Sequence, residues 1–105
     1  MYIAMNRFRI APGSEQDFET LWRERDTYLD GVPGYREFQL VRGPEREDHM
    51  LYATHTVWDS EADFVAWTKS EAFREAHKNA GDNRAMYLGH PEFEGFTVVL
   101  DSAAR

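Results

Sequence analysis

The sequence contains no cysteine, and this absence removes several kinds of chemistry at once. Without thiols there can be no disulfide framework, no thiolate nucleophile and no cysteine-based zinc or iron–sulfur site. The four histidines do not occur at an H-x-x-x-H or comparable ligand spacing, and no G-x-G-x-x-G fingerprint for a flavin or nicotinamide is present. Any metal chemistry must therefore use histidine, a carboxylate or a bound cofactor, and electrons for a redox reaction must come from outside the chain.

Excess positive charge and long apolar runs are also missing. Twelve lysines and arginines stand against 19 acidic residues, for a net charge of -7 at pH 7, so the phosphate-neutralising term that drives nucleic-acid binding is absent. The same charge opposes docking on an anionic membrane, and no apolar run approaches the roughly 20 residues needed to span one. Because Arg7 and Arg9 follow the first apolar residues, the N-terminus does not have the order of a signal peptide. We therefore expect a cytoplasmic protein with neither nucleic acid nor membrane as a partner.

The chain length allows one hydrophobic core and not two, so 105 residues predict a single domain over residues 1–105. Hydrophobic periodicity and turn residues divide this domain into helices and strands. The expected elements, in order, are a strand over 2–10, a helix from Ser14 to about Gly31, strands over 35–41 and 50–58, a helix from Ser60 that restarts at Ser70, a loop over 81–91 and a strand over 93–100.

Capping and turn residues set several of these bounds. Ser14 is followed three residues later by Asp17, and Ser60 is followed in the same way by Asp63, which is the pattern of a helix N-terminus. Gly43-Pro44 is expected to open the charged hairpin loop between the second and third strands. The second and third strands should therefore pair antiparallel.

The order β-α-β-β-α-β is the signature of a ferredoxin-like α+β fold with both helices on one face of the sheet. The last strand is apolar on both sides over residues 96–100, and Ile3 and Met5 alternate with the apolar residues of the other face. The helix-free face therefore needs a cover, and a second copy of the chain is the simplest one. We expect a homodimer with a dimeric α+β barrel architecture.

Trp67 and His77 come from the second helical region and lie ten residues apart. In one unbroken helix ten residues turn through about 1000°, which leaves the two side chains roughly 80° apart. Ser70 has the pattern of a second N-cap, so we expect the helix to stop and restart there. Such a break could bring both side chains to one pocket.

Three residues are candidates for chemistry, and each also has an ordinary structural explanation. His77 follows the small Ala76 near a helix C-terminus, where the macrodipole favours an imidazole, but imidazole is also a common axial ligand of haem iron. Asn6 is unusual in mid-strand, where either a bulge or edge position, or an amide that donates a hydrogen bond toward the helices, would explain it. Trp67 shares an apolar stripe with Phe64, and such stripes are usually core.

The remaining histidines and one arginine have simpler interpretations. For His49, His55 and His90 we expect surface or structural roles, because they lie in loops or within a strand at no ligand spacing. Arg25 on the first helix is, taken alone, typical of a solvated helix face.

In these local contexts the sequence resembles the IsdG-type haem monooxygenases of the antibiotic biosynthesis monooxygenase superfamily. The resemblance extends over nearly the whole chain. The segments that carry it are Asn6-Arg7-Phe8, Pro33-Gly34-Tyr35, Thr56-Val57-Trp58-Asp59-Ser60, Phe64, Trp67, Lys69-Ser70, Phe73 and Ala76-His77-Lys78. The Thr-Val-Trp and Pro-Gly-Tyr pieces occur across the superfamily and indicate the fold, whereas Asn6, Trp67 and His77 together are the functional discriminator.

The resemblance implies that haem is both cofactor and substrate, bound between the sheet and the helices of each subunit. His77 would be the proximal ligand of the iron, Asn6 a distal hydrogen-bond donor to dioxygen, and Trp67 a bulky wall that forces the porphyrin out of plane. The haem-binding residues would be Asn6, Arg25, Phe64, Trp67, Phe73 and His77.

The implied reaction opens the porphyrin ring with dioxygen and releases iron and an open-chain tetrapyrrole. A separate reductase or a small external reductant would supply the electrons. Three alternatives stay open at this point: a cofactor-independent monooxygenase of the same superfamily that oxidises a quinol or polyketide, a non-enzymatic haem-binding protein, and an interaction module built on the dimer. The last is disfavoured because no DNA-binding segment accompanies the domain.

Overall fold

Four antiparallel strands form a single sheet in the computed structural model of the protein, which describes residues 1–77 and 84–102. The strands are β1 (Tyr2–Ile10), β2 (Tyr35–Glu45), β3 (Met50–Trp58) and β4 (Glu92–Thr97). They lie in the order β2-β3-β1-β4, so β1 and β3 are central and β2 and β4 are the edges.

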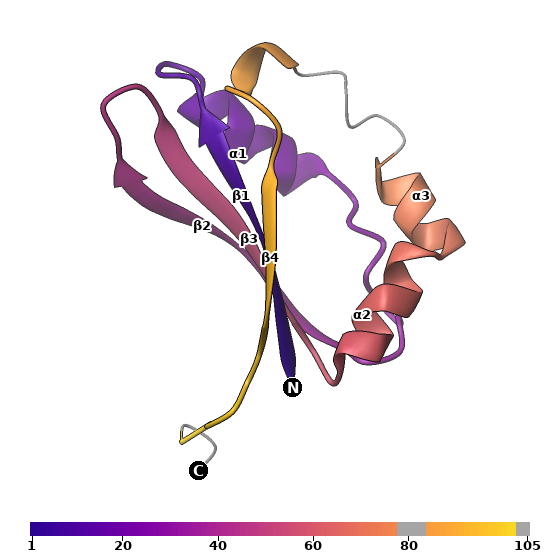
Figure 1. Cartoon of the computed structure of the whole chain (residues 1–105). Helices are drawn as coiled ribbons and strands as arrows, with labels where there is room; N and C mark the ends of the chain where they lie inside the picture. The colour runs from indigo at the N-terminus through magenta and orange to yellow at the C-terminus, as the bar shows by residue number, and fades with distance from the viewer. Residues whose placement is uncertain (78–83, 103–105) are drawn as a thin grey trace.

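The helices cover one face of this sheet (Figure 1). They are α1 (Glu15–Glu24), α2 (Glu61–Thr68) and α3 (Glu71–His77), followed by a short 3₁₀ helix, η1 (Arg84–Met86). Rings from α1 and α2 pack on the same side of β1, because Phe18 contacts Phe8 and Phe64 contacts Tyr2, each at a centroid distance of 5.6 Å. The element order and the one-sided helix layer confirm the predicted ferredoxin-like α+β fold.

The apolar core beneath the helices is divided into two clusters. The first cluster, under α2, contains Tyr2, Ala4, Leu29, Trp58 and Trp67, and the second, under α1, contains Phe8, Ile10, Phe18 and Tyr52. Between them, β1 and β3 place Asn6 opposite Thr54, two polar residues on the helix-facing side of the sheet. Polar residues at the middle of the sheet therefore separate the two apolar clusters.

Several predicted bounds are confirmed. β1 and β3 match the expected strands residue for residue, and β2 and β3 pair antiparallel. The predicted cap at Ser60 is present, because the Ser60 hydroxyl oxygen accepts a hydrogen bond from the Asp63 N–H at 3.2 Å. The second helical region is broken as expected: α2 ends at Thr68, and the Ser70 hydroxyl oxygen accepts from the Phe73 N–H at 3.1 Å at the start of α3.

The predicted first helix was too long and its cap was wrong. α1 ends at Glu24 rather than near Gly31, because Arg25 is already extended and the Asp26 carboxylate accepts the Tyr28 N–H at 2.8 Å, which competes with a helical bond. Tyr28 then has a positive φ of 59°. At the other end Ser14 makes no side-chain capping bond.

The hairpin and the last strand also differ from expectation. Gly43-Pro44 lies within β2, at a register shift between Arg42 and Glu45, instead of opening the loop; a proline is tolerated there because β2 is an edge strand. β4 ends at Thr97, so residues 98–100 do not continue the predicted strand. Of the predicted 81–91 loop, residues 81–83 lie outside the described residues and 84–86 form η1.

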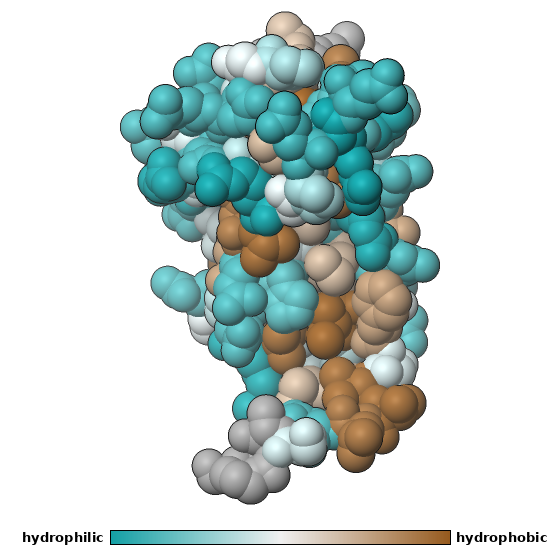
Figure 2. Space-filling view, turned by 90° about the vertical axis from the view of Figure 1, so that its left-hand side faces the viewer, coloured by the Kyte–Doolittle hydropathy of each residue, from teal (hydrophilic) through white to brown (hydrophobic). Residues whose placement is uncertain are grey.

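The sheet face away from the helices carries an exposed apolar patch. By register, Ile3, Met5, Val41, Val57 and Phe96 point to this side; Val41 and Phe96 are 39% and 41% exposed, Ile3 and Met5 are half-buried, and Val57 is buried. Figure 2, which views the molecule from the side opposite α2 and α3, shows apolar side chains gathered over its lower half. No helix within residues 1–77 and 84–102 is long and apolar enough to cross a membrane.

Candidate functional site

A cavity of about 1200 Å³ lies between the sheet and the helices. Its lining residues are Ala4, Asn6, Phe8, Phe38, Thr54 and Thr56 from the sheet, Trp22, Arg25 and Thr27 from the end of α1 and the chain after it, Phe64, Trp67, Thr68, Phe73, Ala76 and His77 from α2 and α3, and Tyr87, Gly89, His90, Pro91 and Phe93 from the segment that leads into β4. All six residues that the sequence predicted to bind haem are among them. The fold therefore brings these six side chains, from β1, α2, α3 and the end of α1, to one space.

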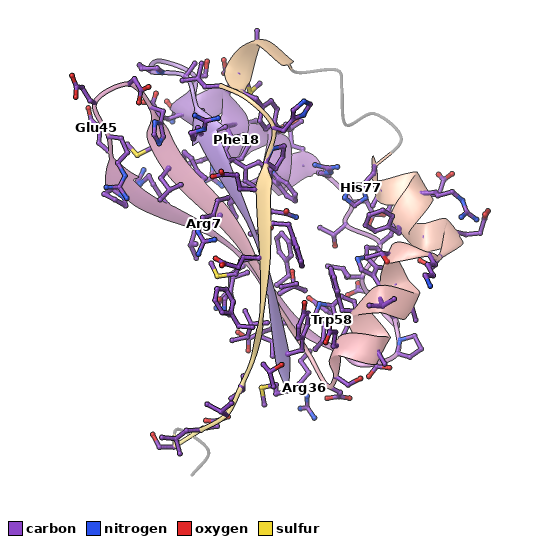
Figure 3. All side chains as sticks on the ribbon, in the orientation of Figure 1. Arg7, Phe18, Arg36, Glu45, Trp58 and His77 are labelled. Carbon is purple, nitrogen blue, oxygen red and sulfur yellow. The ribbon has the colours of Figure 1, made fainter. Side chains whose placement is uncertain are left out.

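His77 is the last residue of α3 and is exposed at the rim of the cavity (Figure 3). Its Nδ1 lies 2.9 Å from the carbonyl oxygen of Phe73, one turn earlier. A carbonyl oxygen can only accept, so Nδ1 carries the proton in this bond, and in the neutral ring the lone pair is on Nε2. The ring also stacks on Phe73 at a centroid distance of 4.1 Å. The imidazole is thus oriented by its own helix, and among the described residues its Nε2 has no hydrogen-bond partner, so this nitrogen can act as a ligand.

Asn6 projects from the sheet wall of the same cavity. It lies in the regular part of β1, opposite Thr54 on β3 and Phe93 on β4, so the bulge or edge explanation for it is wrong. Its side-chain amide makes no hydrogen bond to another residue of the described ranges. The NH₂ group is therefore available as a donor inside the cavity.

Trp67 is both a core residue and part of the cavity wall. Its side chain is 7% exposed, and its ring lies 6.2 Å from Trp58 and 5.5 Å from Phe73, the latter edge to face at 84°. The helix break supports this position, because the Ser70 hydroxyl donates to the carbonyl oxygen of Trp67 at 2.7 Å. Neighbouring rings on both sides make Trp67 a rigid wall rather than a mobile one.

Arg25 does not lie on a solvated helix face. It follows the last residue of α1, and its guanidinium donates to the carbonyl oxygen of Ala76 at 2.8 Å while lying 4.5 Å from the Trp22 ring centroid. Burial lowers the pKa of this guanidinium below its ordinary value. The bond joins the end of α1 to α3 at the residue before His77.

Phe64 and Phe93 form a stacked pair across the cavity, at a centroid distance of 5.5 Å and an angle of 2° between the rings. Phe64 comes from α2 and Phe93 from the edge strand β4. The pair links the helix layer to that edge, and Phe93 is 50% exposed on its outer side.

Sequence reasoning missed the contribution of the chain before β4. His90, expected to have a surface or structural role, lines the cavity, and so does Tyr87, whose pKa is raised by burial and lowered in part by the nearby Arg25. Tyr87 reaches the site because it bridges to Ile10 at the end of β1. This segment has no periodicity, so only the completed fold could indicate its position.

The family model described as "Antibiotic biosynthesis monooxygenase" matches residues 1–79. A curated relative, "Heme oxygenase (staphylobilin-producing)" of Staphylococcus haemolyticus, is 33% identical over 81 residues, which cover 75% of each chain. A second one with the same description, from Staphylococcus saprophyticus, is 26% identical over 81% of each chain.

Two solved structures show how widely this fold is used. The heme-degrader MhuD from Mycobacterium tuberculosis, described with two hemes bound in its active site, has a TM-score of 0.75 and 28% identity, covering 96% of this chain and 98% of its own. SnoaB, a cofactor-independent oxygenase from Streptomyces nogalater, has a TM-score of 0.69 at 22% identity, covering 97% and 96%. At that identity SnoaB shows the fold alone. The matches confirm the resemblance that the sequence predicted.

Proposed function

This chain belongs to the antibiotic biosynthesis monooxygenase family, and from that premise we propose that it is a haem-degrading monooxygenase that holds haem iron through His77. One observation carries the proposal. An imidazole whose Nδ1 is occupied by the Phe73 carbonyl oxygen lies at the rim of a large, mainly apolar cavity that is rich in aromatic side chains. The relatives named as a heme oxygenase and a heme-degrader support haem as the molecule that the cavity binds.

The cavity suits a flat macrocycle in size and in chemistry. Pockets for small organic ligands are commonly about 300–1,000 Å³, and this one, at about 1200 Å³, is larger. Its helix side presents rings from Phe64, Trp67 and Phe73, which can pack against an extended π-system. The donor set fits iron in a porphyrin, because such iron takes neutral imidazole as an axial ligand and needs no cluster of further protein ligands.

His77 would hold the iron through Nε2. Its Nδ1–H bond to the Phe73 carbonyl fixes the tautomer and the orientation of the ring. When bound, haem supplies a redox-active iron that, with dioxygen and electrons from a separate reductase or small reductant, oxidises the porphyrin ring, opens it and frees the iron. The chain's own residues bind and orient the ring and exclude water from it.

Asn6 and Trp67 would act from opposite sides of the cavity. Asn6 presents an amide donor from the sheet, where it can stabilise negative charge that develops on oxygen during the reaction. Trp67, held between Trp58 and Phe73, would press on the macrocycle without moving away. Arg25 would keep α3 at its correct distance through the Ala76 carbonyl.

A homodimer belongs to the same proposal. The patch of Ile3, Met5, Val41, Val57 and Phe96 on the helix-free face would be covered by the same patch of a second copy, since symmetric pairing is the commonest arrangement of soluble oligomers. Size-exclusion chromatography with light scattering should give twice the chain's 12.3 kDa, and Phe96→Asp should shift the mass toward one chain. A wild-type protein of one chain mass would contradict this part.

The proposed activity can be tested with hemin. Addition of hemin to the wild type should give a Soret band with the signature of histidine ligation, and ascorbate under air with catalase present should make the band decay to a bilin-like absorbance. His77→Ala should lose the ligated spectrum, whereas His49→Ala, a matched change in the β2–β3 hairpin beside Asp48, should behave as wild type. Asn6→Ala should bind hemin and turn it over slowly.

The rival functions predict other results in the same experiment. A cofactor-independent oxygenase would give no specific Soret band, and a non-enzymatic haem carrier would give a band that is stable to reductant and air. Normal ligation by His77→Ala would remove the ligand assignment even if degradation were observed.

A further inference from the structure

The lining of the cavity contains no acidic residue among the described positions, although the chain has 19 of them. The groups that are cationic or can become so are Arg25, His77 and His90. In a protein of net charge -7, the described lining therefore offers cationic and no anionic side chains to a bound anion. The proposed function uses His77 for iron and Arg25 for the α1–α3 contact, which leaves His90 without a role.

His90 is placed at the cavity by two fixed points on β1. On one side the Leu88 N–H donates to the carbonyl oxygen of Arg9 at 2.8 Å, and on the other side Glu92 pairs with Arg7 at the start of β4. Only three residues separate these points, so the backbone at His90 has little freedom. Gly89 makes the turn with a φ of 100°, which a side chain would strain.

His90 belongs to the exposed part of the cavity lining. Gly89, His90 and Pro91 are all exposed lining residues, in contrast to Ala4 and Phe8, which are buried on the sheet wall. A ligand that is apolar over its faces and charged at one edge will keep the charged edge at such an exposed part of the lining, since burial of an unpaired carboxylate costs several kcal/mol.

We infer that His90 binds a carboxylate of the ligand at the rim of the cavity, so that the site selects porphyrins that carry free carboxylate side chains. The inference rests on the proposed function and names what the polar edge of that ligand must be. A ring N–H of His90 can donate to a carboxylate in either protonation state, and the bond is stronger when the imidazole is charged. Nothing acidic on the described lining competes for it.

The test compares metal-free protoporphyrin IX with its dimethyl ester, which keeps the ring and removes the charges. Both are titrated in the same detergent into wild type, His90→Ala, His90→Glu and the control His49→Ala, with quenching of tryptophan fluorescence as the readout. His90→Ala should weaken binding of the diacid about tenfold, the size of one hydrogen bond to a charged group, and change binding of the diester less than twofold. His90→Glu should weaken the diacid further and leave the diester unchanged.

Because these porphyrins contain no iron, the result does not depend on ligation by His77. An equal loss for diacid and diester, or no loss for either, would overturn the inference even if hemin is ligated and degraded as proposed. If His90→Ala instead changes the ligation spectrum of hemin in the visible region, His90 is an iron ligand and the carboxylate assignment is wrong. Absence of a histidine-ligated hemin spectrum in the wild type would count against the proposed function itself.

Discussion

α1 and α3 cover the same face of the sheet, but they are held in different ways. α1 inserts Phe18, which is 0% exposed, into a cluster of rings with Phe8 and Tyr52, and a bond from the Tyr52 hydroxyl to the Glu19 carboxylate at 2.6 Å reinforces it. α3 has seven residues and none of them is buried. It is held by its cap at Ser70, by the Arg25 bond to Ala76, and by its partly buried apolar residues, which pack against the first cluster.

This difference places the candidate iron ligand on the less firmly packed half of the helix layer. A helix of seven residues is far below the length that is stable alone, so α3 depends on the few contacts that fix it. A flat ligand in the cavity would add further apolar contacts to Phe73 and Ala76, which line it and are only partly buried. In the proposed function, binding would therefore stabilise α3 more than α1.

Weakening the packing of α1 on the sheet should have the largest effect on the stability of the whole domain. Phe18→Ala removes a fully buried ring and should lower the free energy of unfolding by about 3–5 kcal/mol, measured by urea denaturation with circular dichroism. Val65→Ala on α2, where the side chain is 39% exposed, is the control and should cost less than about 0.5 kcal/mol. Similar losses for the two variants would show that the α1 cluster is not the main core of the domain.

Removing the side-chain bond that holds α3 should have a smaller effect on stability, confined mainly to α3. Arg25→Met removes the charged donor to the Ala76 carbonyl, and such a bond is worth about 1.5–3 kcal/mol. Amide hydrogen exchange should become faster in α3 while α1 keeps its protection. The control is Arg23→Met, because Arg23 lies two residues earlier, in the last turn of α1, but its side chain is 70% exposed in an ion pair with Glu19. Unchanged exchange in α3 would mean that Arg25 does not hold this helix.

Sequence reasoning identified the regular parts of the fold because their signals are local. β1 and β3 have alternating or β-branched residues bounded by turn residues, and the Ser60 and Ser70 caps each use a bond only three residues away. The end of α1 was missed for a tertiary reason. Leu29 continues the helical spacing, but it is buried as part of a non-helical segment after Asp26 has bonded the Tyr28 N–H.

The residues of the candidate site also differ in whether local sequence signals could identify them. Asn6, Trp67 and His77 could be selected because each is unusual for its element or matches a family pattern. Tyr87 and His90 could not, since they reach the cavity through a bridge between Tyr87 and Ile10, residues 77 positions apart that have no common pattern. The bond that Arg25 makes to Ala76 likewise depends on how α1 and α3 pack, which a helix pattern does not contain.

The smallest expected effect is on how the free energy of unfolding depends on pH through the bond between Tyr52 and Glu19 of α1. Burial, and after it the Glu19 carboxylate, raises the pKa of Tyr52 from 10.0 to about 12, so the folded protein keeps a proton that the unfolded chain loses above pH 10. The contribution of this phenol is fully present below pH 10 and is lost as the pH rises through about 12. The same bond, as the largest cause, lowers the pKa of Glu19 below 4.5, so on the acid side its contribution is present above pH 4.5 and is lost as the pH falls through that lowered pKa.

Tyr52→Phe should therefore cost about 1 kcal/mol near neutral pH and should flatten the decline of unfolding free energy between pH 10 and 12, followed by urea denaturation at each pH. Tyr28→Phe, an exposed phenol with a side chain outside both clusters, should keep the wild-type slope. If Tyr52→Phe declines as steeply as wild type, the alkaline loss comes from other groups. In the wild type the Tyr52 phenol is protonated in both the folded and the unfolded state at pH 7 and at pH 9, so the ratio of amide exchange in α3 to that in α1 should be the same at these two pH values.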